Sequence, residues 1–212
     1  GNAVGGVVID SGKFPWLGNS KFPSLSTPSP EYNGLTFAET FGDLAYTMYS
    51  HAISLRDLGC TQSPMNAWIT LNGIETLPLR MERHCSNGLA VAKFLETQSN
   101  VEWVSFAGLE SSPYFELGKK YLPEGTGSVF TFGVKGGYES GLKMLESVEL
   151  FSHVANIGDT RSLILHPAST THRQLTEEQR IAAGAGPEVI RLSIGIECVE
   201  DIISDLDQAL NC

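Results

Sequence analysis

The fold of this chain is decided near its end by the stretch Val189-Ile190-Arg191-Leu192-Ser193-Ile194-Gly195. Its β-branched and apolar residues predict a buried strand over 189–194. Because successive side chains of a strand point to opposite faces, Arg191 leaves the strand opposite Ile190 and Leu192. A guanidinium held on a rigid strand can bind a carboxylate through two parallel hydrogen bonds, which lysine cannot match. The alternative interpretation is an ordinary arginine on the solvated face of a sheet.

Outward from this strand, short strands and helices alternate from Asn100 to the end of the chain. The pattern predicts strands at 101–106, 128–134 and 162–165, and helices at 113–120, 138–146, 177–183 and 199–210. Thr176, followed three residues later by Gln179, predicts a capping box for helix 177–183. We therefore expect an α+β layer, in which helices cover one face of an antiparallel sheet.

The residues before Asn100 are organised differently. An apolar run predicts a strand at 4–9, which is buried on both faces and needs partner strands for its backbone groups. Prolines and aromatic residues alternate over 12–33 and predict an ordered excursion rather than a helix. Residues 35–58 show helical signals. The strongest predicted helix begins at Ser63-Pro64 and reaches Leu95, with bends or interruptions at Pro78 and Gly88.

Composition restricts the classes of protein to be considered. With 212 residues and 42% hydrophobic residues, the chain can form a packed core. A formal net charge of −10 argues against nucleic acid as a partner, because phosphate binding needs a cationic surface. No apolar run reaches the roughly 18 residues of a membrane span. Four widely spaced cysteines without a C-x-x-C pair indicate free thiols in a reducing cytoplasm.

Other residues that could carry chemistry are few. Asn156, in Asn156-Ile157-Gly158-Asp159, could offer its amide to a substrate carboxylate, although a turn residue is the simpler interpretation. The spacing of His153, His166 and His172 matches no helical metal site, so we expect no metal. No phosphate loop and no nucleophile elbow is present. These patterns alone predict an α/β chain with one candidate carboxylate-binding residue and do not identify a reaction.

Several stretches resemble the carboxyl-terminal half of O-acetylhomoserine sulfhydrylases, which belong to the pyridoxal-phosphate-dependent cystathionine and methionine metabolism family. The stretches that carry the resemblance are Gly5–Phe14, Ser63–Trp68, Gly73–His84, Asn156–Leu163 and His166–Arg173. Cystathionine lyases and synthases usually show Ser-Leu-Gly where this chain has Asn156-Ile157-Gly158. The proline-rich excursion is also typical of the sulfhydrylase branch.

The resemblance implies an α/β fold of the aspartate-aminotransferase type, PLP-dependent transferase fold type I. Residues 1–78 would be the end of the large cofactor-binding domain, including the excursion and a linking helix. Residues 79–212 would be the complete small α+β domain. By motif, Arg191 corresponds to the family's carboxylate-binding arginine, and Asn156 to a neighbouring residue that lines the same pocket.

The implied reaction is a γ-replacement in which O-acetylhomoserine and sulfide give homocysteine and acetate. Pyridoxal phosphate would be the cofactor, and Arg191 would orient the substrate. Family members are usually tetramers, so a homo-oligomer is expected. The alternatives are a cystathionine γ-synthase, a methionine γ-lyase, or a non-catalytic assembly module that kept the fold.

The chain departs from the family pattern at its amino-terminal end. The family's Ser-x-Thr-Lys motif, which carries the Schiff-base lysine, would lie just before Gly1. The family's other cofactor ligands would also lie upstream. We therefore expect no catalytic residue within this chain. We also expect the chain to be inactive without an amino-terminal part of the same enzyme as its partner.

Overall fold

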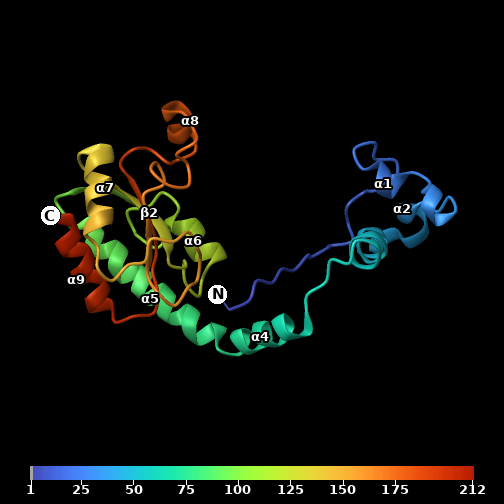
Figure 1. Cartoon of the computed structure of the whole chain (residues 1–212), viewed down its shortest axis with the longest axis horizontal. Coiled ribbons are helices and arrows are strands. Elements are labelled where there is room, and N and C mark those ends of the chain that lie inside the picture. Colours follow the sequence, from blue (N-terminus) through green and yellow to red (C-terminus); the bar gives the residue numbers. More distant parts are fainter. Residues whose placement is uncertain (1) are drawn as a thin grey trace. The chain divides into compact units, whose positions relative to one another are not determined.

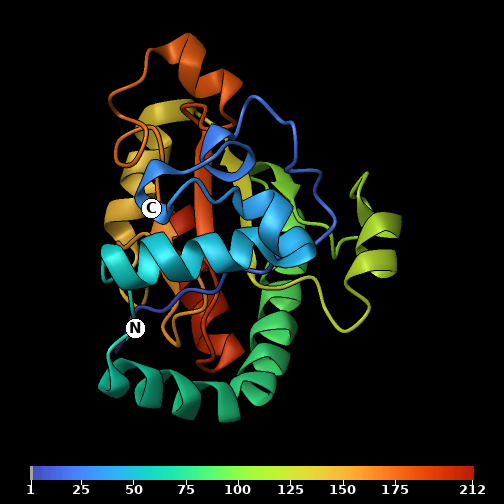
Figure 2. The ribbon, with the colours of Figure 1, turned by 90° about the vertical axis from the view of Figure 1, so that its right-hand side faces the viewer.

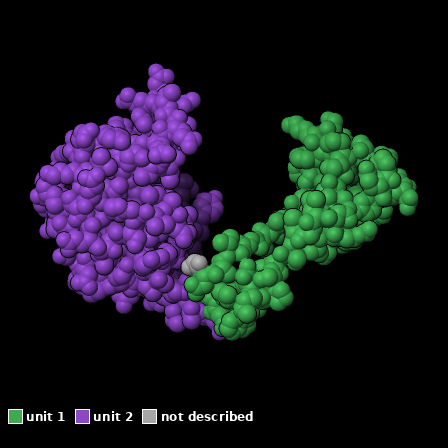
Figure 3. All heavy atoms as spheres, viewed as in Figure 1, with its two compact units in different colours: residues 1–73 green, residues 74–212 purple. Residues whose placement is uncertain are grey.

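A computed structural model describes residues 2–212 of the chain. The chain divides into two compact units, shown in different colours in Figure 3. Unit 1 extends to Gly73, and unit 2 spans Ile74–Cys212. The expected assignment of 1–78 to a large domain and 79–212 to a small one stays a prediction.

Unit 2 is built on an antiparallel sheet. Within the described residues this sheet has four strands in the order β1-β2-β4-β3. The strands are β1 (Val101–Ser105), β2 (Val129–Val134), β3 (Leu163–Leu165) and β4 (Val189–Ser193). The helices are α5 (Leu77–Glu96), α6 (Phe115–Tyr121), α7 (Gly137–Ser147), α8 (Glu177–Ala182) and α9 (Val199–Leu210). The α+β layer predicted from the sequence is confirmed, as is the capping box of Thr176 and Gln179.

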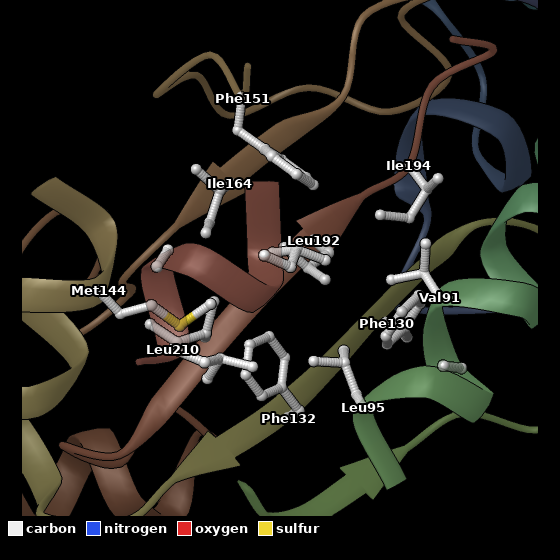
Figure 4. Close-up of a cluster of buried hydrophobic side chains, with 14 of the residues drawn as sticks. Val91, Leu95, Phe130, Phe132, Met144, Phe151, Ile164, Leu192, Ile194 and Leu210 are labelled. Atoms are coloured by element: carbon white, nitrogen blue, oxygen red, sulfur yellow. The ribbon is translucent and has the colours of Figure 1, made fainter. Parts of the chain in front are cut away.

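One face of the sheet carries the hydrophobic core. Phe132 of β2 lies opposite Ile190 of β4 in the register, and both side chains are fully buried. Helices α5, α7 and α9 cover this face (Figure 1) and contribute Leu95 and Met144 to the same cluster. Figure 4 shows Phe132, Leu95 and Met144 converging between the strands and the helices. β4 pairs with β2 from Val189 to Ser193 and with β3 from Arg191 to Ser193, and the packed core holds it in place from one face.

The long helix predicted from Ser63 to Leu95 is interrupted near Pro78, as expected, and forms two helices, α4 (Pro64–Glu75) and α5. Pro78 lies in the first turn of α5, where a missing N–H costs nothing, so α5 begins there as a separate helix. The expected bend at Gly88 is wrong, because α5 is one unbroken helix from Leu77 to Glu96 (Figure 2). A Cβ on Gly88 would lie 3.0 Å from the Cα of Ser128. Glycine therefore allows close packing against the loop before β2 and does not break the helix.

Unit 1 consists of short helices and irregular segments. In order they are α1 (Pro23–Ser26), η1 (Pro30–Tyr32), α2 (Phe37–Phe41), η2 (Gly42–Leu44), α3 (Ala45–Tyr49), the π-helix η3 (Ser50–Asp57), and α4 (Pro64–Glu75), which crosses into unit 2. The excursion over 12–33 therefore contains two short helical turns, which the sequence did not predict. An aromatic cluster holds it in place: Trp16 stacks on Tyr46 with ring centroids 5.7 Å apart.

The strand predicted at 4–9 is wrong for the structure of this chain. These residues form no regular structure, and Val4, Val7, Val8 and Ile9 are each at least 73% exposed. A strand is stable only when another strand accepts and donates its backbone hydrogen bonds. None of the described residues pairs with this run, so its apolar side chains remain uncovered.

Candidate functional site

Arg191 lies at the centre of β4, on the face of the sheet opposite to the core. It pairs with Thr131 of β2 on one side and with Leu165 of β3 on the other. Both flanking residues of β4, Ile190 and Leu192, are completely buried on the core face. Arg191 itself is only partly buried. The alternation read from the sequence therefore describes the strand correctly, and the guanidinium emerges from a rigid sheet.

The guanidinium of Arg191 has no acceptor within the part of the chain that the structure describes. The ion pairs there involve Arg56, Lys119 and Arg161, and Arg180 reaches a backbone carbonyl. Arginine is costly to remove from water without an anionic partner. A partly buried, unpaired guanidinium on a fixed strand is therefore suited to bind a carboxylate from outside the chain.

Asn156 lies in an exposed loop of residues 153–159, which we call the Asn156 loop. Its Oδ1 accepts a hydrogen bond of 2.9 Å from the N–H of Ile157. This contact agrees with the simpler interpretation of a turn residue, and it leaves the Nδ2 amide without a partner among the described residues. No hydrogen bond joins Asn156 to Arg191 in the structure described. The substrate-binding role of Asn156 therefore stays a prediction.

The Asn156 loop is closed at its base. The N–H of Ser152 donates to the carbonyl of Ser162 at 3.0 Å, and the carbonyl of Ser152 accepts from the N–H of Ile164 at 3.1 Å. Within the loop, the carboxylate of Asp159 accepts hydrogen bonds from the backbone N–H and the guanidinium of Arg161. The Arg161 guanidinium lowers the pKa of Asp159 below its ordinary value. These contacts connect the loop directly to β3 and hence to β4.

Helix α5 contributes two buried polar residues that the sequence did not single out. His84 Nδ1 lies 2.7 Å from the carbonyl of Ile194, so this nitrogen carries the proton that is donated. One turn further on, Asn87 Nδ2 donates to the carbonyls of Gly195 at 3.1 Å and Glu197 at 2.9 Å. The two side chains hold the segment that follows β4. The signal available in the sequence is the spacing of His84 and Asn87, two polar residues three positions apart on the apolar face of a predicted helix.

His166, one of the three histidines considered for a metal, is instead a structural residue. It is fully buried, and its Nε2 lies 2.8 Å from the carbonyl of Pro187 while Nδ1 lies 3.0 Å from Ser169 Oγ. The ring of Tyr138 meets it edge-on with centroids 4.9 Å apart. Nε2 donates to the carbonyl of Pro187, and the Ser169 hydroxyl lies within hydrogen-bond distance of both Nδ1 and the carbonyl of His166, at 3.0 and 3.2 Å. Among the described residues no group of three or more His, Cys, Asp or Glu could hold a metal ion.

The described residues offer side-chain donors to an anion but no buried lysine. All seven lysines are exposed, so none is a desolvated amine of the kind that attacks a carbonyl. Arg191 and the amide of Asn156 are donors to an anion.

Across residues 2–212 no helix is both long and apolar enough to cross a membrane.

A family model described as Cys/Met metabolism PLP-dependent enzyme matches residues 1–211. The chain therefore belongs to this family of pyridoxal-phosphate-dependent enzymes. It is 48% identical to a homocysteine synthase of Schizosaccharomyces pombe over 99% of this chain and 49% of the relative. It is 47% identical to an O-acetyl-L-homoserine sulfhydrylase of Leptospira meyeri, again over 99% of this chain and 49% of the relative. The chain thus spans about half the length of the curated relatives it matches.

Solved structures agree with this assignment. A Campylobacter jejuni protein assigned as O-acetylhomoserine (thiol)-lyase was solved with N′-pyridoxyl-lysine-5′-monophosphate. It matches with a TM-score of 0.83 and 38% identity over 93% of this chain and 47% of its own chain. The expected fold class, the aspartate-aminotransferase-like α/β fold of type I PLP-dependent transferases, is confirmed.

Proposed function

We propose that this chain is the carboxyl-terminal part of a PLP-dependent O-acetylhomoserine sulfhydrylase, which converts O-acetylhomoserine and sulfide to homocysteine and acetate. The chain would supply the wall of the active site that binds the amino-acid carboxylate. An amino-terminal part of the same enzyme would supply the lysine and the other ligands of the cofactor. This proposal is supported by relatives named as homocysteine synthase and O-acetylhomoserine sulfhydrylase that are about twice as long as this chain.

In the proposed enzyme, the chemistry supplied by pyridoxal phosphate would be that of an electron sink for loss of the α-proton and the γ-substituent. Arg191 holds the substrate carboxylate through two parallel N–H···O bonds, and Asn156 adds an amide donor to the same group. Because Arg191 is carried by a central strand, it fixes the direction of the substrate's α-carbon at little entropic cost. Neither residue transfers a proton.

The single observation that carries the proposal is the unpaired guanidinium of Arg191. It lies between Thr131 and Leu165 on a strand whose other face is completely packed. A merely structural arginine at such a position would be expected to have a carboxylate or carbonyl partner. None is present among the described residues, and a substrate carboxylate would supply it.

A chimeric enzyme tests the proposal. This chain would replace the matching half of the Leptospira meyeri sulfhydrylase, to which it is 47% identical. With pyridoxal phosphate, O-acetylhomoserine and sulfide, the chimera should form homocysteine at a rate that rises with sulfide concentration. The relative's amino-terminal half alone, prepared in the same way, is the control for residual activity.

The same chimera separates the alternatives. Faster turnover with cysteine than with sulfide would indicate a cystathionine γ-synthase, and cleavage of methionine alone would indicate a methionine γ-lyase. A folded, PLP-loaded chimera that converts none of these substrates would favour the non-catalytic assembly module and contradict the proposal. The cofactor's visible absorbance shows whether loading took place.

The proposal also includes an assembled, cytoplasmic enzyme, with a tetramer as the expected form. Its support is the exposed apolar surface of α4, where Met65, Trp68 and Leu71 are each 62% exposed and would be covered by other parts of the assembly. All four cysteines are free thiols, as expected for a protein of a reducing compartment. Light scattering of the chimera would give the number of subunits.

A further inference from the structure

The carboxylate of Glu197 joins the segment after β4 to the segment before β3. Its Oε1 accepts the backbone N–H of Ser162 at 2.7 Å, and its Oε2 accepts the hydroxyl of Ser162 at 2.9 Å. The hydroxyl oxygen of Ser162 also accepts the N–H of Gly195 at 2.9 Å. Ser162 is fully buried and Glu197 is partly buried, so the bond from Gly195 is shielded from water and the two bonds to Glu197 are shielded in part.

The backbone tightens the same junction. The N–H of Ile196 donates to the carbonyl of Thr160 at 2.9 Å. A Cβ on Gly195 would collide with the backbone of Thr160 and Arg161, so only glycine allows this approach. Behind the junction, Asn87 of α5 holds the carbonyls of Gly195 and Glu197. Glu197 is therefore aimed at Ser162 by a fixed backbone.

This junction lies at one end of the Asn156 loop. The other end, which precedes Ser152, is held by Asp205 of α9, whose carboxylate accepts the N–H groups of Glu149, Leu150 and Phe151 at 2.8–3.3 Å. Among the described residues, the hydrogen bonds of the loop itself are local: Asp159 with Arg161, Asn156 with Ile157, and the N–H of Val154 with the carbonyl of Ser152. The position of Asn156 relative to β4 therefore depends on how the two ends of the Asn156 loop are held.

We propose that Glu197 is a positioning residue. It holds the Asn156 loop in a fixed position relative to strand β4, so that Asn156 and Arg191 face one substrate carboxylate. This inference rests on the function proposed above. Glu197 does not touch the substrate in this arrangement. It acts through Ser162 and the short segment that leads back to Asn156.

The test uses the chimeric enzyme and steady-state kinetics. In Glu197→Ala, KM for O-acetylhomoserine should rise about tenfold, the order of effect expected when a binding group is misplaced. The kcat and the KM for sulfide should change much less, because Arg191 still orients the α-carbon of the substrate when Asn156 is displaced. Glu197→Gln keeps one acceptor for the Ser162 N–H and should lie between Glu197→Ala and the unsubstituted chimera. Glu200→Gln is the matched control, since this exposed carboxylate accepts a hydrogen bond from the nearby Cys198 rather than from the Asn156 loop.

A double-mutant cycle with Asn156→Ala separates positioning from general destabilisation. If Glu197 acts through Asn156, the double variant should have the same KM as the worse single variant. Hydrogen exchange gives a second readout: the amides of Ile157 and Arg161 should exchange faster in Glu197→Ala, while that of Leu192 in the core should not. If Glu197→Ala fails to fold, Glu197→Gln enters the same cycle.

Additive effects of the two substitutions would overturn the inference, as would a fall in kcat with an unchanged KM. The proposed function fails in a distinguishable way. If Arg191→Lys and Asn156→Ala each leave KM for O-acetylhomoserine unchanged, the carboxylate site itself is wrong, and the positioning role is overturned with it. If those two variants raise KM and Glu197→Ala does not, only the positioning role is rejected.

Discussion

Leu165 of β3 lies directly opposite Arg191 of β4 in the sheet register. Leu165 is 6% exposed, so the aliphatic part of the arginine side chain emerges beside a buried apolar neighbour. Arginine commonly covers apolar surface with its methylene groups and presents only the guanidinium to a partner. This relationship explains how an arginine that has no acceptor among residues 2–212 can be held in one direction.

The first prediction concerns this arginine. In the chimeric enzyme, Arg191→Ala should lower kcat/KM for O-acetylhomoserine by roughly 2–5 kcal/mol, because the substrate carboxylate loses its charged partner. Arg191→Lys should recover only part of this loss, since an ammonium group cannot form two parallel bonds. Steady-state kinetics at fixed sulfide measures both variants.

Arg56 supplies the control for this experiment. Its side chain is 75% exposed and pairs with the neighbouring Asp57. Arg56→Ala should leave kcat/KM unchanged. If both substitutions lowered kcat/KM equally, the loss would reflect the change in net charge rather than binding of the substrate carboxylate by Arg191.

The second prediction concerns Asp205, whose carboxylate accepts three backbone N–H groups at the base of the Asn156 loop. Asp205→Asn replaces one acceptor oxygen with a donor and leaves a buried N–H unsatisfied. The free energy of unfolding should fall by about 1.5–3 kcal/mol, the usual value of hydrogen bonds to charged groups. Asp207→Asn, at an exposed position of the same helix, should change it by less than about 0.5 kcal/mol. Urea unfolding of the chain measures both, and equal losses would contradict the prediction.

The third prediction concerns Gly133 of β2. A Cβ at this position would overlap the indole ring of Trp103 in β1, so Gly133→Ala must displace the tryptophan. We expect a loss of about 1–3 kcal/mol in the free energy of unfolding, as for other overpacked cores. Gly73→Ala in helix α4 is the matched control, because its Cβ would meet nothing within 4 Å. That substitution should stabilise the helix by about 0.5–1 kcal/mol. Thermal unfolding measures the stability of both variants. If both substitutions changed it in the same direction, this explanation would be wrong.

The fourth prediction concerns pH. The side-chain hydrogen bond from Arg161, together with its backbone N–H, lowers the pKa of Asp159. A carboxyl group whose pKa is lower in the folded state stabilises that state above its unfolded pKa, and this contribution is lost as the pH falls through the folded value. In Arg161→Gln the pKa of Asp159 should rise toward its ordinary value, and the backbone N–H should retain part of the lowering. NMR titration of the carboxyl carbon measures the shift; an unchanged pKa would mean that the guanidinium is not the cause.

The effect of this ion pair on stability should be small. Arg161 is 68% exposed, and solvent screens pairs of this kind. The unfolding midpoint in urea should fall slightly less with acidification in Asp159→Asn than in the unsubstituted chain. Added salt should reduce the difference.

Local patterns predicted much of unit 2. The alternation around Arg191 and the amphipathic spacing of 199–210 both depend on neighbouring residues, and the structure shows β4 and α9 at those places. The capping box at Thr176 is local in the same sense. Gly88 was misinterpreted because a glycine that bends a helix and one that admits a close neighbour look alike in the sequence. The apolar run at 4–9 was misinterpreted because a strand needs a partner, and no local pattern supplies one.

The amino-acid sequence by itself determined the periods of the strands and helices, the direction in which Arg191 leaves its strand, and the family to which the chain belongs. Only the tertiary structure decided which polar groups meet. Glu197 and Ser162 are 35 residues apart, and His84 and Ile194 are 110 apart. A carboxylate or imidazole can bond to any donor or acceptor that the fold brings within about 3 Å, and hydrogen bonds leave no periodic trace in sequence. The arrangement around the Asn156 loop therefore follows from the packing of α5, β3, β4 and α9 together.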